Sequence, residues 1–143
     1  MKVLMLSWEY PPHMVGGLGQ HVYDISRYLV MQNVEVHIIT PRVKDYPDNE
    51  TLAGVYIHRV GYPTCEASAD DFKGWTFTFN SEAIREAVHL NSKIGGFDLV
   101  HAHDWMVAYA GRSVSKIFSI PLVTTIHATE YGRNLGLHNR TQR

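Results

Sequence analysis

Residues 2–30, KVLMLSWEYPPHMVGGLGQHVYDISRYLV, show the fold class most clearly. They begin with a short apolar run at 2–7, which has the length and composition of a strand buried on both faces of a sheet. From Gly17 onward, apolar residues recur with the spacing of one helix face: Leu18, Val22, Ile25 and Leu29. A buried strand, a glycine-rich loop and an amphipathic helix in this order are typical of a β-α-β unit.

The same alternation of strands and helices continues along the chain. Further strands are predicted at 34–40, 55–60, 97–102 and 121–126, and helices at 17 to about 32, 81 to about 93 and 105 to about 118. Ser81 is the expected N-cap of the second helix, and Gly95-Gly96 its end. The stretches 42–54 and 61–76 are predicted as loops. Strands that alternate with helices form a parallel sheet with helices on both faces, so we predict a doubly wound, Rossmann-like α/β fold.

Length and composition limit the classes of protein that fit. The 143 residues suit one domain, and the polar sequence after the fifth predicted strand suggests an incomplete one that self-associates. A balance of 13 basic and 14 acidic residues makes nucleic acid an unlikely partner. No apolar run approaches the roughly 20 residues of a membrane span, and no signal sequence is recognised, so we expect a cytoplasmic protein. The single cysteine, Cys65, excludes an internal disulfide.

The first candidate binding loop is Gly16-Gly17-Leu18-Gly19, which follows the first strand and opens a helix. In open parallel sheets, ligands bind outside the carboxyl ends of the strands, near the point where the strand order reverses. The N–H groups at the start of a helix suit an anion such as a diphosphate. The alternative is an ordinary turn at a helix start. The dinucleotide fingerprint G-x-G-x-x-G is not present.

The second candidate loop is His101-Ala102-His103-Asp104-Trp105, at the end of the fourth predicted strand. Three interpretations stay open. His101, His103 and Asp104 form a metal site, since both histidines lie on the same side of a strand. Alternatively, the histidines are buried and hydrogen-bonded while Asp104 caps the next helix. In the third interpretation, Asp104 and Trp105 contact a carbohydrate, which offers hydroxyls to a carboxylate and C–H faces to a ring.

The third candidate is His127, which follows the fifth predicted strand at the same expected edge of the sheet. A carboxylate, a phenol and a guanidinium follow at 130–133. A single histidine at a strand end is most often structural. The convergence of three loops at one edge weakens this structural interpretation, and a ligand contact is the alternative.

Together, residues 7–12 (SWEYPP), 16–19 (GGLG), 101–105 (HAHDW) and 125–130 (TIHATE) strongly resemble the N-terminal domain of the retaining glycosyltransferases that include glycogen and starch synthases. The resemblance spans nearly the whole chain. It implies an enzyme with two Rossmann-like domains facing each other across a cleft, the GT-B architecture. Residues 1–143 would then form an incomplete, acceptor-side N-terminal domain, and the C-terminal donor-binding domain would be absent.

The resemblance also implies roles for particular residues. The backbone at Gly16, Gly17 and Leu18 would bind the donor diphosphate. His127 would contact the transferred glucosyl unit, and Asp104 would lie in the catalytic cleft. Glu9, Tyr10 and Trp105 are further expected substrate contacts.

The implied reaction is glycogen biosynthesis: transfer of glucose from ADP-glucose or UDP-glucose to an α-1,4-glucan with retained configuration. No cofactor and no catalytic metal are expected. The chain alone is expected to be inactive, because basic residues that the reaction needs belong to the absent C-terminal domain.

One residue departs from the family pattern. Bacterial glycogen synthases carry a lysine two positions before the glycine pair, where this chain has Met14. The donor nucleotide, the sugar and the acceptor therefore stay open. A glycosyltransferase for another sugar or acceptor, and a carbohydrate-binding half-domain without catalysis, are the alternatives.

Overall fold

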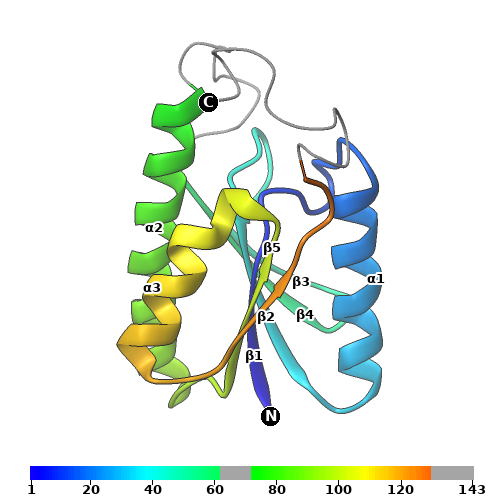
Figure 1. The fold of residues 1–143 in the computed structure, drawn as a ribbon. Helices are drawn as coiled ribbons and strands as arrows, with labels where there is room; N and C mark the ends of the chain where they lie inside the picture. The colour runs from blue at the N-terminus through cyan, green and yellow to red at the C-terminus, as the bar shows by residue number, and fades with distance from the viewer. Residues whose placement is uncertain (62–71, 130–143) are drawn as a thin grey trace.

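The computed structural model describes residues 1–61 and 72–129, without the side chain of Lys73. Within them, six strands form one sheet with helices on both faces (Figure 1). The strands are β1 (Lys2–Leu6), β2 (Glu35–Pro41), β3 (Asn49–Leu52), β4 (Val55–Val60), β5 (Leu99–His103) and β6 (Leu122–Thr125). The helices are α1 (Gly17–Met31), α2 (Phe72–Ile94) and α3 (Ala108–Phe118), and a 3-10 turn, η2 (Trp105–Val107), precedes α3.

The strand order is β3-β4-β2-β1-β5-β6, and all neighbouring strands are parallel except β3 and β4. After β1 the chain adds β2 and β4 on one side of β1. Helix α2 then leads the chain to β5, which lies on the other side of β1. The strand order therefore reverses between β1 and β5, where Val3 pairs with Leu99 and Leu6 with Ala102. This is the place where open α/β sheets bind ligands.

The alternation of side chains along β1 separates two hydrophobic cores. Val3 and Met5 pack with the α1 residues Leu18 and Val22 on one face. On the other face, Leu4 and Leu6 belong to a core with residues of α2 and α3. In Figure 1, α1 accordingly lies on one side of the sheet and α2 and α3 on the other. The doubly wound, Rossmann-like prediction is confirmed.

Strand β3 corrects the prediction that 42–54 is a loop. It runs antiparallel to β4 at the edge of the sheet, joined to it by a short turn at 53–54. Three of its four residues, Asn49, Thr51 and Leu52, are exposed, and only one of the four is apolar. A strand with no buried face leaves no alternation of apolar and polar residues in the sequence.

Helix α2 begins at Phe72, nine residues before the predicted N-cap Ser81. The Ser81 hydroxyl donates to the carbonyl of Phe77, 3.0 Å away inside the helix, so Ser81 is not a cap. The predicted end is confirmed, because Gly95 and Gly96 have φ of +79° and +105°. Residues 72–76 of the predicted long loop are therefore helical, and 62–71 lie outside the described residues.

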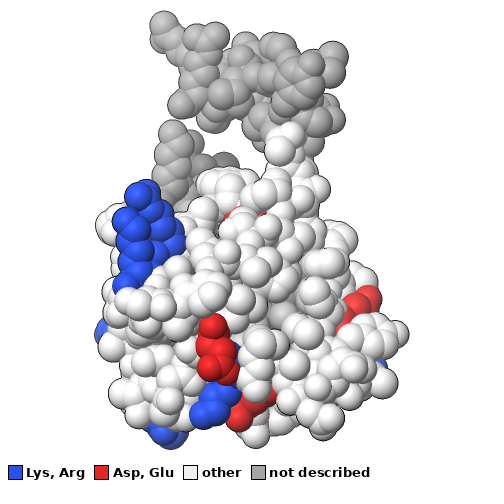
Figure 2. Space-filling model, turned by 60° about the horizontal axis from the view of Figure 1, so that its bottom comes forward, with Lys and Arg blue, Asp and Glu red and all other residues white. Residues whose placement is uncertain are grey.

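The face in Figure 2 carries few charged side chains over the described residues: a basic group at one side, an acidic group at the other and a group of both signs between them. Such a face does not offer the broad basic surface that holds a nucleic-acid backbone. Within 1–61 and 72–129, no helix combines the length and the apolar character needed to cross a membrane.

Candidate functional site

A pocket of about 440 Å³ lies at the carboxyl ends of the strands, where the strand order reverses. The loops after β1, β5 and β6 all contribute to it. Its lining consists of Trp8, Glu9, Gly16, Gly17, Leu18, Asp104, His127 and Ala128. The structure thus brings together most of the site residues predicted from the sequence, from three loops that are far apart along the chain.

The carboxylate of Glu9 organises the glycine loop. Glu9 is buried, and its Oε2 accepts hydrogen bonds from the backbone N–H groups of Val15 (3.0 Å), Gly16 (3.1 Å) and Gly19 (3.3 Å). An internal anion therefore already holds the amide of Gly16, which was expected to face the diphosphate. The next amides, of Gly17 and Leu18, lie in the first turn of α1 and have no acceptor within the helix.

The three glycines of this loop differ in what surrounds them. A Cβ on Gly19 would lie 2.9 Å from Cγ of Met14 and 3.1 Å from Oε2 of Glu9, so packing requires a glycine there. A Cβ on Gly16 or Gly17 would meet no described protein atom within 4 Å. The open space at Gly16 and Gly17 leaves room for a ligand to approach the backbone.

Asp104 is buried at the pocket wall, where its side chain makes a capping contact and its backbone has an unusual conformation. Its Oδ1 accepts a hydrogen bond from the N–H of Trp105 (2.8 Å), so the predicted capping role is confirmed for η2. Its backbone has φ 69° and ψ 175°, a region that is almost exclusive to glycine and is strained for other residues by about 1–3 kcal/mol. Strain of this kind is concentrated at functional sites, and Asp104 does line the pocket.

The histidines at the strand ends behave differently from one another. His101 shares a hydrogen bond of 2.8 Å between its Nε2 and Oγ1 of Thr125, as the structural interpretation predicted. His103 is fully buried, and neither of its ring nitrogens has a hydrogen-bond partner among the described residues. Burial lowers the pKa of His103 to about 2 and also lowers the pKa values of His101 and His127. All three rings are therefore neutral near pH 7.

Two expected substrate contacts, Tyr10 and Trp105, do not line this pocket. Tyr10 is only 1% exposed, and its hydroxyl shares a 2.9 Å hydrogen bond with the hydroxyl of Ser26 in the core beneath α1. Burial raises the pKa of Tyr10, and its role here is structural. Trp105 is 57% exposed and lines a neighbouring apolar hollow of about 290 Å³ with Phe72, Thr76, Phe77, Asn80 and Tyr109.

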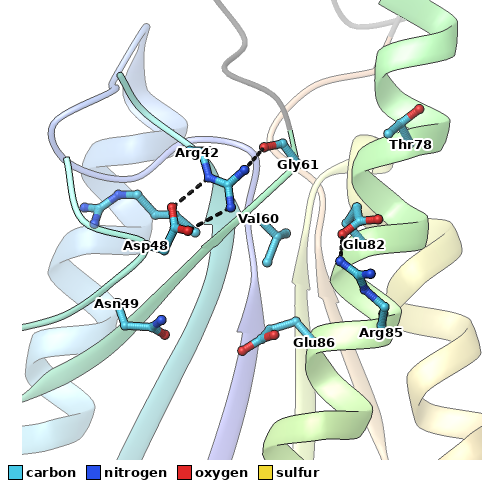
Figure 3. A pocket seen from close by; sticks show the side chains of 10 residues that line it. Arg42, Asp48, Asn49, Val60, Gly61, Thr78, Glu82, Arg85 and Glu86 are labelled. Atoms are coloured by element: carbon cyan, nitrogen blue, oxygen red, sulfur yellow. Dashed lines mark hydrogen bonds and ion pairs between the residues drawn. The ribbon is translucent and has the colours of Figure 1, made fainter. Parts of the chain in front are cut away.

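A second polar pocket, of about 330 Å³, was not predicted (Figure 3). It lies between the ends of β2 and β4 and the side of α2. Arg42 forms a bidentate ion pair with Asp48, at 2.7 and 2.8 Å, and donates to the carbonyl of Gly61. Across the pocket, Glu82 pairs with Arg85 on α2. Because these residues come from a missed strand, a predicted loop and a helix, no local motif in the sequence indicated the pocket.

A mostly parallel sheet, a glycine-opened helix after its first strand and a pocket at the reversal of strand order define a Rossmann-like ligand-binding domain. Comparison with known proteins narrows this class. Residues 15–143 match the model of the family described as Glycosyltransferase Family 4. The chain belongs to this family.

Two relatives illustrate the range of the family. A glycogen synthase of Mycobacterium tuberculosis is 36% identical over 148 aligned residues, which cover 95% of this chain and 36% of the relative. A D-inositol 3-phosphate glycosyltransferase of Frankia alni is 33% identical over 116 residues, covering 78% of this chain and 28% of the relative. The chain thus spans about a third of the length of these relatives.

Solved structures show the same fold. Sucrose-phosphate synthase from Thermosynechococcus elongatus superposes with a TM-score of 0.75 at 15% identity, covering 99% of this chain and 37% of that one. The catalytic domain of starch synthase IV from Arabidopsis thaliana, bound to ADP and acarbose, superposes with a TM-score of 0.66 at 20% identity and covers 95% and 37%. The expected N-terminal domain of a GT-B glycosyltransferase is therefore confirmed.

Proposed function

We propose that the full-length protein transfers glucose from ADP-glucose or UDP-glucose to an α-1,4-glucan with retained configuration, and that this chain supplies the acceptor-side domain. The observation that carries the proposal is the single pocket shared by the glycine loop, Asp104 and His127. These are the groups that an anionic donor carrying a hexose requires: amides for the diphosphate and polar side chains for the sugar.

The donor diphosphate would meet the amides of Gly17 and Leu18. These N–H groups stand at the positive end of the α1 dipole, where negative charge is stabilised. As the bond between the sugar and the diphosphate breaks, negative charge develops on the leaving group, and fixed amides stabilise it without reorganisation. The bonds from Glu9 to the amides of Val15, Gly16 and Gly19 keep the loop in this form before the donor arrives.

The sugar would lie between Asp104 and His127. The Nε2 atom of His127 has no described partner, and its neutral ring can donate to or accept from a sugar hydroxyl. One oxygen of Asp104 caps η2, which fixes the carboxylate while its other oxygen can accept a hydroxyl. In this arrangement Asp104 and His127 orient the transferred unit.

Among the described residues, the lining of this pocket carries no positive charge for a diphosphate. Its described lining contains the carboxylates of Glu9 and Asp104 and neither lysine nor arginine. Two carboxylates repel a diphosphate, so basic groups from outside the described lining are needed to bind one. This charge balance supports the proposals that a C-terminal domain completes the site and that the chain is inactive by itself.

The test is transfer of labelled glucose from ADP-glucose and UDP-glucose to glycogen by the full-length product of the reading frame. Asp104→Asn and His127→Ala should each lower kcat/KM by about 100-fold or more, because each removes a group that orients the reacting sugar. Asp45→Asn and His89→Ala, at exposed positions away from the pocket, are the matched controls and should retain activity. Absence of both transfer and donor hydrolysis would reject the proposal.

A different sugar or acceptor is the second candidate. The similarity to a D-inositol 3-phosphate glycosyltransferase favours it, since members of this family differ in acceptor. A panel of nucleotide sugars with glycogen, maltooligosaccharides and inositol phosphate as acceptors separates the two candidates. Transfer to inositol phosphate but not to any glucan would establish the second and exclude the first.

A further inference from the structure

Three histidine rings meet beside the candidate pocket, one from each of three elements. His21 lies in α1, His103 ends β5 and His127 follows β6. The ring centroids are 4.9 Å apart for His21 and His127, 5.7 Å for His21 and His103, and 5.8 Å for His103 and His127. One nitrogen from each ring lies within 4.8 Å of the other two. The three rings thus place one nitrogen each within a small common region.

The described part of the chain leaves these nitrogens unsatisfied. Neither ring nitrogen of His103 has a hydrogen-bond partner there, although the side chain is fully buried, and Nε2 of His127 also has none. A buried polar atom without a partner costs about 1–3 kcal/mol. Because His103 is held at the end of β5 and cannot reach solvent, a bound species that accepts its lone pair would satisfy one of its two ring nitrogens.

We propose that His21, His103 and His127 bind a divalent transition-metal ion of the zinc class. Neutral imidazole nitrogens are typical ligands of Zn²⁺, Co²⁺, Ni²⁺ and Cu²⁺. Tetrahedral coordination at about 2.0–2.1 Å places ligand nitrogens about 3.4 Å apart, so the three rings must close by roughly an ångström. His21 is exposed, and rotation of its side chain can provide much of this closure.

The charges around the cluster favour a cation. The carboxylates of Glu9 and Asp104 line the adjoining pocket together with His127. Three protein ligands leave a fourth coordination position open. The metal would have no catalytic role. It would occupy one ring nitrogen of His127 and leave the N–H of the other nitrogen to donate to a sugar hydroxyl, so the inference neither depends on the proposed glycosyl transfer nor removes that contact.

This site differs from the one suggested by the sequence, His101 with His103 and Asp104. Nε2 of His101 shares a hydrogen bond with Oγ1 of Thr125, and Oδ1 of Asp104 accepts a hydrogen bond from the backbone N–H of Trp105. His21 takes their place because α1 brings it across the end of the sheet, which no sequence spacing revealed. Only His103 is common to both sets.

The test is titration of the untagged, metal-free chain with Co²⁺ and Zn²⁺ near pH 7.5, followed by visible absorption and calorimetry. One ion per chain should bind, with a tetrahedral Co²⁺ spectrum that Zn²⁺ displaces. His21→Ala and His127→Ala should each weaken binding by about 100-fold or more, since even second-shell changes weaken metal sites by 10- to 100-fold. Circular dichroism should show unchanged folding for His21→Ala, because this side chain is exposed.

His89→Ala is the matched control, since His89 is exposed on α2 and distant from the cluster in sequence and fold. It should bind metal like the parent chain. Absence of stoichiometric binding, or binding that survives both His21→Ala and His127→Ala, would overturn the proposal. Either result would leave the glycosyl-transfer proposal untouched, because that proposal is tested by its own assay.

Discussion

At the scale of single residues, Glu9 shows how one side chain shapes a binding loop. Its buried carboxylate accepts three backbone hydrogen bonds at the start of α1, and its own backbone is linked to the hydroxyl of Ser7. Hydrogen bonds to a charged acceptor are worth about 1.5–3 kcal/mol. Glu9 therefore holds the loop, and the glycines inside it differ in role: packing requires Gly19, whereas Gly16 and Gly17 border open space.

Gly17 and Gly19 offer a direct separation of ligand binding from packing. Gly17→Ala adds a methyl group where no described atom lies within 4 Å, so the free energy of unfolding should stay constant or rise by up to about 1 kcal/mol from helix propensity. The affinity of the full-length protein for the nucleoside diphosphate should fall at least tenfold, because the new methyl group obstructs the amide. Denaturant unfolding and calorimetric titration measure the two effects.

Gly19→Ala is the contrasting variant. Its methyl group collides with Met14 and Glu9, so it should lower the free energy of unfolding by about 1–3 kcal/mol. If Gly17→Ala left nucleoside diphosphate affinity unchanged, the assignment of the diphosphate to the α1 amides would be wrong.

His58 predicts a pH dependence of stability. Burial lowers its pKa to about 4, and its ring nitrogens are bonded to His37 (3.0 Å) and Asn49 (2.8 Å). Lys93 and His89 also act electrostatically on this ring. The folded chain keeps the ring neutral, whereas the unfolded chain protonates it below about pH 6.5. This contribution to stability is thus complete above about pH 6.5 and is lost as the pH falls toward 4.

The loss that one such proton causes is at most about 1.4 kcal/mol per pH unit. In His58→Gln, the slope of unfolding free energy against pH between 6.5 and 4 should therefore be smaller, by up to about 1.4 kcal/mol per pH unit. Urea unfolding at several pH values measures the slope. The exposed His89→Gln, in contrast, should leave the slope nearly unchanged, and equal slopes for all three proteins would contradict the neutral, buried state of His58.

At the scale of elements, the sequence predicted the strands that form apolar runs and missed the one that does not. The central strands β1, β2, β4 and β5 are buried and were recognised from apolar runs. Strand β3 is an exposed edge whose position depends on pairing with β4. Helix α2 does bury Trp75, Phe79 and Ala83 at every fourth position, but the exposed Phe77 between them obscures that period.

The same reasoning explains which parts of the site were predictable. The glycine loop, Asp104 and His127 follow separate strands, and the topology of a doubly wound sheet is enough to bring strand ends together. His21 lies within a helix, and Arg42 pairs with Asp48, which precedes the missed strand β3, so their neighbours depend on tertiary packing. The burial of Tyr10 was equally hidden, because residues within one motif can face opposite ways.

At the scale of the whole molecule, the two edge strands of the described sheet, β3 and β6, differ in how much apolar side chain they expose. Strand β3 is polar apart from Leu52. Along β6, by contrast, Leu122 and Val123 are 37% and 43% exposed, and Ile126 just beyond is 54% exposed. In the described residues no further strand pairs with β6. An apolar edge strand with unpaired backbone groups is a site of association between chains.

The chain taken alone should therefore self-associate through β6. Val123→Lys places a charge on this edge and should shift the chain toward the monomer, because a buried lysine at a strand-to-strand contact is strongly unfavourable. Val88→Lys is a matched control, since Val88 on α2 has the same exposed fraction, 43%, but belongs to no strand. Light scattering over a concentration series should show association in the parent chain and in Val88→Lys, and less in Val123→Lys. A parent chain that stays monomeric throughout, or an equal effect of both substitutions, would show that the β6 edge does not drive association.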